Sequence, residues 1–313
     1  MYKTFYELTR NPFELSPDPY FFYPTKRHNE ALATLSYGVL KRKGFVVVSG
    51  EVGTGKTLLL RCLLDLLNAN DVAFAFVYNP LLSVQEFLAY LMSDLRLPLA
   101  GQKKSEMLSY LNNYLMVRSK RGATTALIVD EAHLLSWELL EEIRLLTNLE
   151  TSQNKLLQIV LVGQPELDRK LDSPELRQLK QRIGLRCQLE ALGLDEVRGY
   201  IHRRLELSGG NHRDVSIFSE DAIKAVHEFS MGIPRIVNNL CENSLISGYG
   251  KQTKQITADI VGEVAKDLRL AGVHSAPPGR EAFDIASAGC TSANRETQKT
   301  LDLKNLESGL DAQ

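Results

Sequence analysis

The stretch Gly44-Phe-Val-Val-Val-Ser-Gly-Glu-Val-Gly-Thr-Gly-Lys-Thr57 decides the fold. Its first half is a continuous apolar run ending in glycine, which is typical of a strand buried on both faces. Its second half, Gly50–Thr57, has the spacing GxxxxGK[ST], and apolar side chains then recur at helical spacing over 56–69. A strand, a glycine-rich turn and a helix in this order predict a phosphate-binding loop (the Walker A motif).

The chemistry of phosphate binding explains each residue type in this loop. Glycines let the backbone wrap a phosphate closely with its N–H groups pointing inward. The Lys56 ammonium can reach the β- and γ-phosphates of ATP, and the Thr57 hydroxyl can ligate Mg²⁺. The residues expected to hold the nucleotide are Gly50, Glu51, Val52, Gly53, Thr54, Gly55, Lys56, Thr57 and Leu58.

A second motif, Ala126-Leu-Ile-Val-Asp-Glu-Ala-His133, is typical of a buried strand that ends in two carboxylates (Walker B). Asp130 is expected to hold the Mg²⁺ shell, and Glu131 to orient and deprotonate the attacking water. The letters DEAH, together with Gln181-Arg-Ile-Gly184, also suggest a helicase. Such helicases need two sheets, and only one fits before residue 192, so the helicase interpretation is disfavoured.

The remaining pattern predicts an α/β fold with a five-stranded parallel sheet, followed by a helical domain. We expect strands at 45–49, 72–78, 126–130, 156–162 and 185–189, and after residue 192 helices at 195–207, 219–229, 234–248 and 257–268. The expected divisions are an arm and helix packed on the ATPase domain (1–43), the αβα domain (44–192), a helical lid (193–270) and a disordered tail (271–313). A short docking motif at 301–306 is an open possibility within that tail.

Three further side chains are candidates for contact with the γ-phosphate. Gln164 follows the fourth strand, although Gly-Gln-Pro can be a simple turn. Arg182 belongs to a basic cluster before the fifth strand that could reach a neighbouring subunit, or could be a solvated face; the other members are Arg177, Lys180 and Arg186. Arg235, in Met231-Gly-Ile-Pro-Arg, can point back at the phosphate or cap a helix.

Composition limits the other classes of function. With 37 Lys and Arg against 38 Asp and Glu, the net charge of −1 excludes a polybasic nucleic-acid binder. The four cysteines lack metal-site spacing. No apolar stretch reaches 18 residues, so we expect a cytoplasmic protein without a transmembrane helix.

Taken together, these motifs resemble the AAA+ ATPases, in which a P-loop αβα domain precedes a helical lid. The resemblance implies that Glu131 is the catalytic base, Gln164 is sensor 1 and Arg235 is sensor 2. Gln164 departs from the commoner Asn or Thr. The resemblance also implies that Arg182 acts in trans, so that the protein forms a homo-oligomer. It further implies an adenine pocket between arm and lid, with Tyr23, Pro24 and Ile201 as candidates.

Several segments more closely resemble the ATPase domain of the general secretion pathway protein A (ExeA/GspA) group: Tyr6–Asp18, Tyr23–His28, Asn79–Ser83 and 161–167. The resemblance implies an ATPase that drives or regulates a secretion or exopolysaccharide-export system at the inner membrane. Proteins of that group continue into a membrane span and a peptidoglycan-binding region. Neither is present in this sequence, so we expect a short cytoplasmic relative.

Two alternatives stay open. The group is related to transposition ATPases of the TniB/MuB kind, so the chain could instead be an ATP-dependent DNA-binding regulator. The basic runs at 40–44 and 177–186 would then contact DNA, with an affinity that falls steeply with salt. An adaptor that binds ATP without turning it over is disfavoured because Lys56, Asp130 and Glu131 are all present.

Overall fold

The computed structural model describes residues 1–98, 103–151, 154–209 and 216–270. The predicted tail at 271–313, with its possible docking motif at 301–306, lies outside the described residues.

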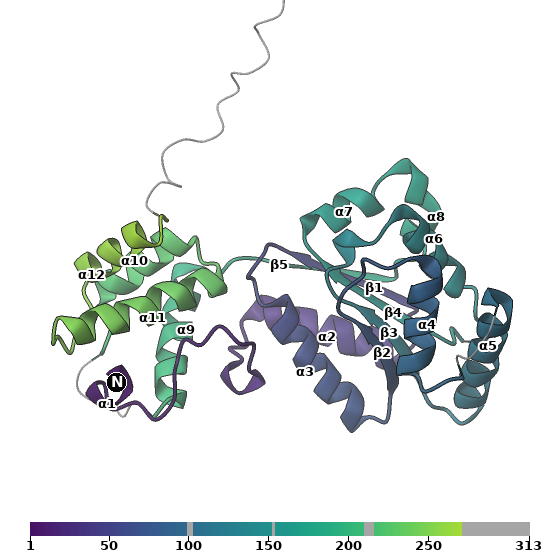
Figure 1. Ribbon diagram of the computed structural model, residues 1–313, viewed down its shortest axis with the longest axis horizontal. Coiled ribbons are helices and arrows are strands. Elements are labelled where there is room, and N and C mark those ends of the chain that lie inside the picture. Colours follow the sequence, from purple (N-terminus) through teal and green to yellow (C-terminus); the bar gives the residue numbers. More distant parts are fainter. Residues whose placement is uncertain (99–102, 152–153, 210–215, 271–313) are drawn as a thin grey trace, which may run out of the picture. The chain divides into compact units, whose positions relative to one another are not determined.

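A single five-stranded parallel sheet forms the centre of the region up to residue 189 (Figure 1). Its strands are β1 (Phe45–Gly50), β2 (Ala73–Val77), β3 (Thr125–Val129), β4 (Gln158–Gly163) and β5 (Leu185–Leu189). They lie in the order β2-β3-β4-β1-β5, and every pair is parallel. The predicted sheet is confirmed. Because β4 separates β1 from β3, the loops after these three strands leave the sheet side by side.

Helices cover both faces of this sheet because its strands alternate their side chains between two apolar cores. Val46 and Val48 pack with α2 (Lys26–Leu40) and α3 (Lys56–Ala69). Phe45 and Val47 belong to the core on the other face. The helices of that face include α4 (Val84–Asp94), α5 (Lys104–Lys120) and α6 (Trp137–Leu146).

The segment between β4 and β5 contains more helix than the sequence indicated. Helix α7 (Pro165–Leu171) begins directly after Gln164, where a turn was the alternative. Proline suits this first helical position because its missing N–H would have no partner there. Residues 174–180 then form a 3₁₀ turn, η3 (Pro174–Leu176), followed by one turn of helix, α8 (Arg177–Lys180).

After β5 the described chain is helical, as predicted. The four helices are α9 (Leu194–Leu207), α10 (Glu220–Ser230), α11 (Pro234–Gly250) and α12 (Ala258–Asp267), called the lid helices below. The turn into α11 requires glycine at position 232, where φ is +71°. A Cβ there would lie 2.0 Å from the carbonyl oxygen of Leu192, so the end of α10 packs directly on the backbone that leaves the sheet.

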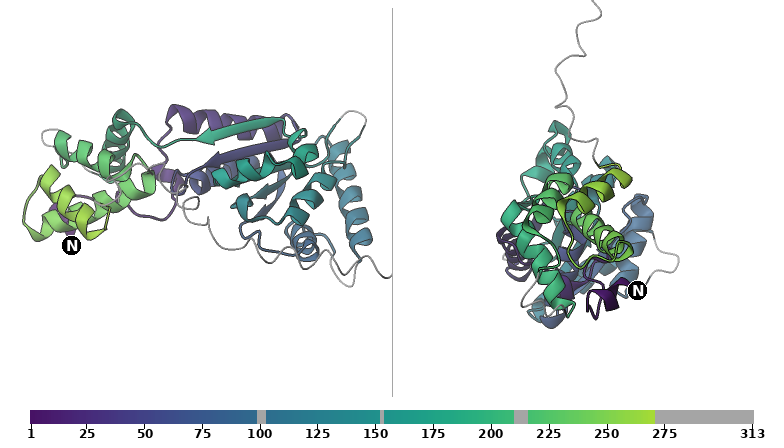
Figure 2. Two further views of the ribbon diagram at one scale, coloured as in Figure 1. Left: turned by 90° about the horizontal axis from the view of Figure 1, so that it is seen from above. Right: turned by 90° about the vertical axis from the view of Figure 1, so that its left-hand side faces the viewer.

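The arm (residues 1–24) corrects one expectation. It was expected to pack on the sheet domain, but its first part packs on the lid helices (Figures 1 and 2). Tyr6 and Phe13 are fully buried in the lid core, and the Tyr6 hydroxyl donates to the Thr253 carbonyl at 3.0 Å. The arm contains α1 (Tyr2–Phe5) and the 3₁₀ turn η1 (Pro19–Phe21). The end of the arm contacts the sheet domain, because η1 lies against α3 and Phe22 packs on the core that contains Val46 and Val48. Helix α2, farther along the chain, packs on the sheet itself.

Candidate functional site

The loop after β1 has the backbone geometry of an anion cradle. Gly53 and Gly55 have φ of +82° and +98°, in the left-handed region that glycine adopts without strain. A Cβ on Gly53 would also lie 2.8 Å from the Cβ of Arg235, so α11 approaches the loop closely. Helix α3 begins at Lys56, and its first N–H groups face the loop without helical partners.

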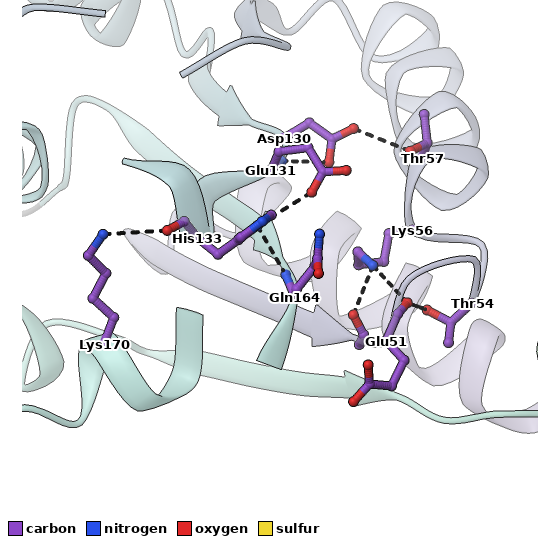
Figure 3. Close-up of polar contacts among 10 residues, drawn as sticks. Glu51, Thr54, Lys56, Thr57, Asp130, Glu131, His133, Gln164 and Lys170 are labelled. Atoms are coloured by element: carbon purple, nitrogen blue, oxygen red, sulfur yellow. Dashed lines mark hydrogen bonds and ion pairs between the residues drawn. The ribbon is translucent and has the colours of Figure 1, made fainter. Parts of the chain in front are cut away.

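Lys56 is a buried cation held by the loop itself (Figure 3). Its Nζ donates to the carbonyl oxygens of Gly50 at 2.8 Å and Glu51 at 2.9 Å. Burial lowers the pKa of the ammonium, and the nearby carboxylates of Glu131 and Asp130 oppose that shift. A phosphate entering the cradle would therefore meet a cation whose hydrogen bonds can be exchanged.

Thr57 and Asp130 bring two hard oxygen ligands together. The Thr57 hydroxyl donates to Asp130 Oδ2 at 3.4 Å, and the Glu131 N–H donates to Asp130 Oδ1 at 2.8 Å. Burial raises the pKa of Asp130, which a bound cation would reverse. Within the described ranges no group of three or more His, Cys, Asp or Glu side chains could hold a metal. The pair fits Mg²⁺ that arrives with nucleotide phosphates and keeps its waters.

Glu131 occupies a strained backbone position beside a histidine that sequence reasoning missed. Its φ of +49° is unusual for a residue with a side chain. Its Oε2 lies 3.4 Å from Nδ1 of His133, and the Gln164 N–H donates to the same Nδ1 at 3.5 Å. The sequence offered one signal for this residue: His133 is the fourth residue of the DEAH segment that contains Asp130 and Glu131. His133 therefore links Glu131 in the loop after β3 to Gln164, the residue after β4.

A cavity of about 270 Å³ joins these groups. It brings together Lys56, Thr57, Glu131, Gln164 and Arg235, which the sequence had placed in one site. Val52, Gly53, Gly55 and Leu58 also line it. Gly50, Glu51 and Thr54 support the cavity from behind: the first two bind Lys56, and the Thr54 hydroxyl donates to the Glu51 carbonyl at 2.8 Å.

The other wall of the cavity comes from the arm and the lid helices, and most of it was missed by sequence reasoning. Its residues are Glu14, Leu15, Ser16, Pro17, Tyr200, Arg204, Pro234 and Asn238, besides Arg235. Of the adenine candidates, Tyr23 lines a smaller adjoining cavity of about 30 Å³, whereas Pro24 and Ile201 line neither. Ile201 is buried in the lid core.

Two lid side chains tie this wall to the arm. The Tyr200 hydroxyl donates to Asn238 Oδ1 at 2.9 Å. Arg204 is 4% exposed, donates to the Pro12 carbonyl at 2.6 Å, and packs against the rings of Phe21 and Tyr200. The segment Arg203-Arg-Leu-Glu-Leu had no signal to separate this buried arginine from a solvated one.

Arg182 lies outside the cavity, near the amino-terminal ends of the strands, whereas the phosphate loop lies at their carboxyl ends. Two residues after Arg182, the Gly184 N–H donates to the carbonyl of Phe45, which is the first residue of β1. The phosphate loop begins at the other end of this strand, at its last residue, Gly50. At about 3.3 Å per residue, β1 separates the two ends by roughly 16 Å. The Arg182 guanidinium donates to the Thr147 hydroxyl at 2.8 Å, so it does not contact the nucleotide cavity of its own chain.

Comparison with known proteins agrees with this geometry. Residues 39–171 match the family model described as "AAA domain". General secretion pathway protein A of Aeromonas hydrophila is 37% identical over 290 residues, covering 92% of this chain and 52% of that protein. The chain thus spans about half the length of this relative.

Solved structures share the fold at low sequence identity. Cdc6p of Pyrobaculum aerophilum superposes with a TM-score of 0.60 at 17% identity, over 82% of this chain and 70% of that one. The Holliday junction branch migration motor RuvB of Thermotoga maritima gives 0.53 at 18%, over 78% and 70%. The Drosophila ORC bound to DNA gives 0.60 at 18%, over 86% and 66%.

A search of the described helices for one long and apolar enough to span a bilayer finds none. The phosphate loop, the parallel sheet and the match over residues 39–171 show that this chain contains an AAA domain with the P-loop of an ATPase, and the chain is similar over most of its length to general secretion pathway protein A.

Proposed function

We propose that this ATPase hydrolyses Mg-ATP with Glu131 as the base, and that assembled copies use the turnover to drive or regulate a secretion or export system at the inner membrane. The observation that carries the proposal is the single cavity in which Lys56, Thr57, Glu131, Gln164 and Arg235 converge. The similarity to general secretion pathway protein A supports the choice of client system.

Each side chain has a role that its position supports. Bound Mg-ATP supplies the phosphoanhydride to be cleaved and the cation that neutralises it. Lys56 offers positive charge to the outer phosphates, while Thr57 and Asp130 hold the metal. Glu131 orients a water and accepts its proton, aided by the His133 ring beside it. Gln164, at the start of α7, contacts the γ-phosphate or the water.

Arg235 supports a coupling between the site and the lid helices. Its backbone N–H donates to the Gly53 carbonyl at 3.2 Å, while its side chain lines the cavity. Contact between Arg235 and the γ-phosphate would therefore bias the position of α11 against the phosphate loop. We propose that hydrolysis releases this bias and moves the lid helices.

Arg182 supports assembly into a homo-oligomer. Because the length of β1 separates it from its own phosphate loop, only a second copy could receive it as an arginine finger. Two other basic side chains of its cluster form ion pairs within the chain. Lys180 and Arg186 pair with Asp172 at 3.1 Å and 3.3 Å.

The same pairing weakens the DNA-binding alternative. In the second basic run, Arg42 donates to the carbonyls of Gly122 and Ala123, and Lys43 lies over the ring of Tyr37. In both runs some cationic side chains therefore already have partners within the chain, and these contacts would have to break before the side chains could bind DNA phosphates. The experiment below distinguishes DNA binding from this proposal.

The test is ATP turnover per subunit against protein concentration, with and without duplex DNA, at two salt concentrations. The proposal predicts turnover that rises steeply with concentration and is indifferent to DNA. Turnover per subunit that does not change with protein concentration, but is stimulated by DNA in a way that high salt abolishes, would contradict the proposal. It would favour the ATP-dependent DNA-binding regulator instead.

A mixing experiment tests the finger. Arg182→Ala subunits are added to wild type at constant total protein, with Arg203→Ala, an exposed lid residue, as the matched control. Turnover should fall more steeply than the wild-type fraction. A rate merely proportional to wild-type content would remove Arg182 from that role.

A further inference from the structure

His28 lies against the phosphate loop although it belongs to α2, far away in the sequence. The residue is 6% exposed, with Nε2 of its ring 3.0 Å from the Thr54 carbonyl oxygen and Nδ1 2.7 Å from the Thr25 hydroxyl. A Cβ on Gly55 would lie 3.2 Å from that Nε2. The imidazole is therefore packed directly on the Thr54–Gly55 peptide.

The partners fix the tautomer of this ring. A carbonyl oxygen only accepts, so Nε2 must carry the hydrogen. Nδ1 then keeps a lone pair, which accepts from the Thr25 hydroxyl, and both nitrogens are satisfied by a neutral ring. Burial lowers the pKa of His28, in keeping with the neutral form, while the hydrogen bond to the Thr54 carbonyl and the Glu196 carboxylate on α9 act in the opposite sense.

The consequence for the loop follows from the planarity of the peptide. In a trans peptide the carbonyl of Thr54 and the N–H of Gly55 point in opposite directions. Holding the carbonyl on His28 therefore aims the Gly55 N–H away from the ring, on the side where Gly55 and Lys56 line the cavity. Among the described residues this N–H has no backbone acceptor.

We propose that His28 is a positioning residue for the phosphate site: its neutral Nε2–H fixes the Thr54 carbonyl and so presents the Gly55 amide to a bound phosphate. The inference rests on the proposed binding of ATP at this loop. Without His28 the peptide is free to rotate, and a carbonyl oxygen turned inward would repel a phosphate.

The experiment compares two amide substitutions that reach different ring positions. The amide nitrogen of His28→Gln can occupy the place of Nε2 and still donate to Thr54, whereas His28→Asn is too short. His202→Asn, at an exposed position of α9, is the matched control. Affinities of the full chain for ADP and AMP are measured by titration calorimetry, and thermal unfolding is recorded for every variant.

We expect His28→Asn to weaken ADP binding by about tenfold or more, the loss typical of a hydrogen bond to a charged group, and to change AMP binding by less than about twofold. His28→Gln should restore ADP binding to within about threefold. Unchanged ADP binding in folded His28→Asn would overturn the proposal. So would equal losses for ADP and AMP that follow a lowered melting temperature.

The imidazole ¹⁵N spectrum of the wild-type chain supplies a second test, which no failure of a variant to fold can affect. At pH 7 the His28 signals, assigned through bonds from the backbone of the wild-type chain, should show the Nε2–H tautomer. An Nδ1–H tautomer or an imidazolium would overturn the proposal. A wild-type chain that binds no ADP would instead overturn the proposed function and this inference with it.

Discussion

The two walls of the nucleotide cavity differ in how the chain builds them. The phosphate wall comes from short contiguous stretches, Gly50–Leu58 and Asp130–Glu131. The opposite wall joins the arm, at 14–17, to α9 and α11, which lie more than 180 and more than 210 residues later in the chain. Phosphate binding depends on backbone N–H groups in a fixed turn, which a local motif can specify. The opposite wall depends on side chains that only the tertiary fold brings together.

The two walls also differ in the partners of their polar side chains. On the lid side, side chains join separate segments: the Tyr200 hydroxyl donates to Asn238 and the Arg204 guanidinium to the Pro12 carbonyl, while Arg204 Nε has no hydrogen bond among the described residues. On the phosphate side, Lys56 binds only carbonyls, and Glu131 has its Oε2 buried with no hydrogen bond among the described residues. We infer that the phosphate wall carries the chemistry and the lid wall carries the coupling.

The largest effect should come from the phosphate wall. Glu131→Gln removes the base while keeping the shape of the side chain, so kcat for ATP should fall by about 100-fold or more with ATP affinity retained. Steady-state turnover and ATP titration measure the two quantities. Glu138→Gln, exposed in the first turn of α6, is the control. Turnover near the wild-type rate would show that Glu131 is not the base. It would also contradict the inference that the phosphate wall carries the chemistry.

The lid wall should respond in stability. Phe13 is fully buried between the arm and the lid helices and stacks edge-on with Phe218. Phe13→Ala should lower the free energy of unfolding by about 3–5 kcal/mol, as measured in urea. Tyr20→Ala, on the same arm but 48% exposed, should cost under about 1 kcal/mol. Equal costs would mean that the arm is not part of the lid core.

A smaller effect on turnover should follow from removing His133, which joins the loop after β3 to the start of α7 after β4. His133→Ala removes the ring that contacts Glu131 and the Gln164 amide, so kcat should fall by about tenfold with KM unchanged. Rapid-quench turnover at saturating ATP measures it, and His202→Ala serves as the control. A change confined to KM would place His133 in nucleotide binding instead.

The smallest effect is a pH dependence of stability. Burial holds the pKa of His28 below its unfolded value of 6.5, so the folded chain binds fewer protons below that pH. This group should leave the free energy of unfolding unchanged above about pH 6.5. Below it, stability should fall by at most about 1.4 kcal/mol per pH unit until the folded pKa is passed. Urea unfolding from pH 5 to 8 measures this loss.

The variant His28→Gln isolates that contribution, because Asp130 and other acids titrate equally in both proteins. The difference in unfolding free energy between wild type and variant should be constant above pH 6.5 and shift against the wild type below it. A difference that stays constant down to pH 5 would contradict a buried neutral His28.

Sequence patterns predicted the sheet because continuous apolar strands between helices leave little choice of architecture. They also predicted Lys56, Thr57, Asp130 and Glu131, whose chemistry requires fixed spacing. They missed α7, because Gly-Gln-Pro has the composition of a turn, although proline also suits the first position of a helix.

What could not be predicted lies in contacts between distant segments. Arg204, Asn238 and His28 are ordinary polar residues on amphipathic helices, and only the folded chain shows what each one touches. For the arm, the packing of its first part on the lid helices was not predicted, because aromatic residues specify burial but not the surface against which they are buried.

The most direct test of a nucleotide shared between both walls is hydrogen–deuterium exchange of the Glu131→Gln chain with and without Mg-ATP. We predict slower exchange at 50–58 and, in the same complex, at 12–17, at the cavity-lining part of α9 and at the start of α11. Protection confined to the phosphate loop and the ends of β3 and β4 would contradict it.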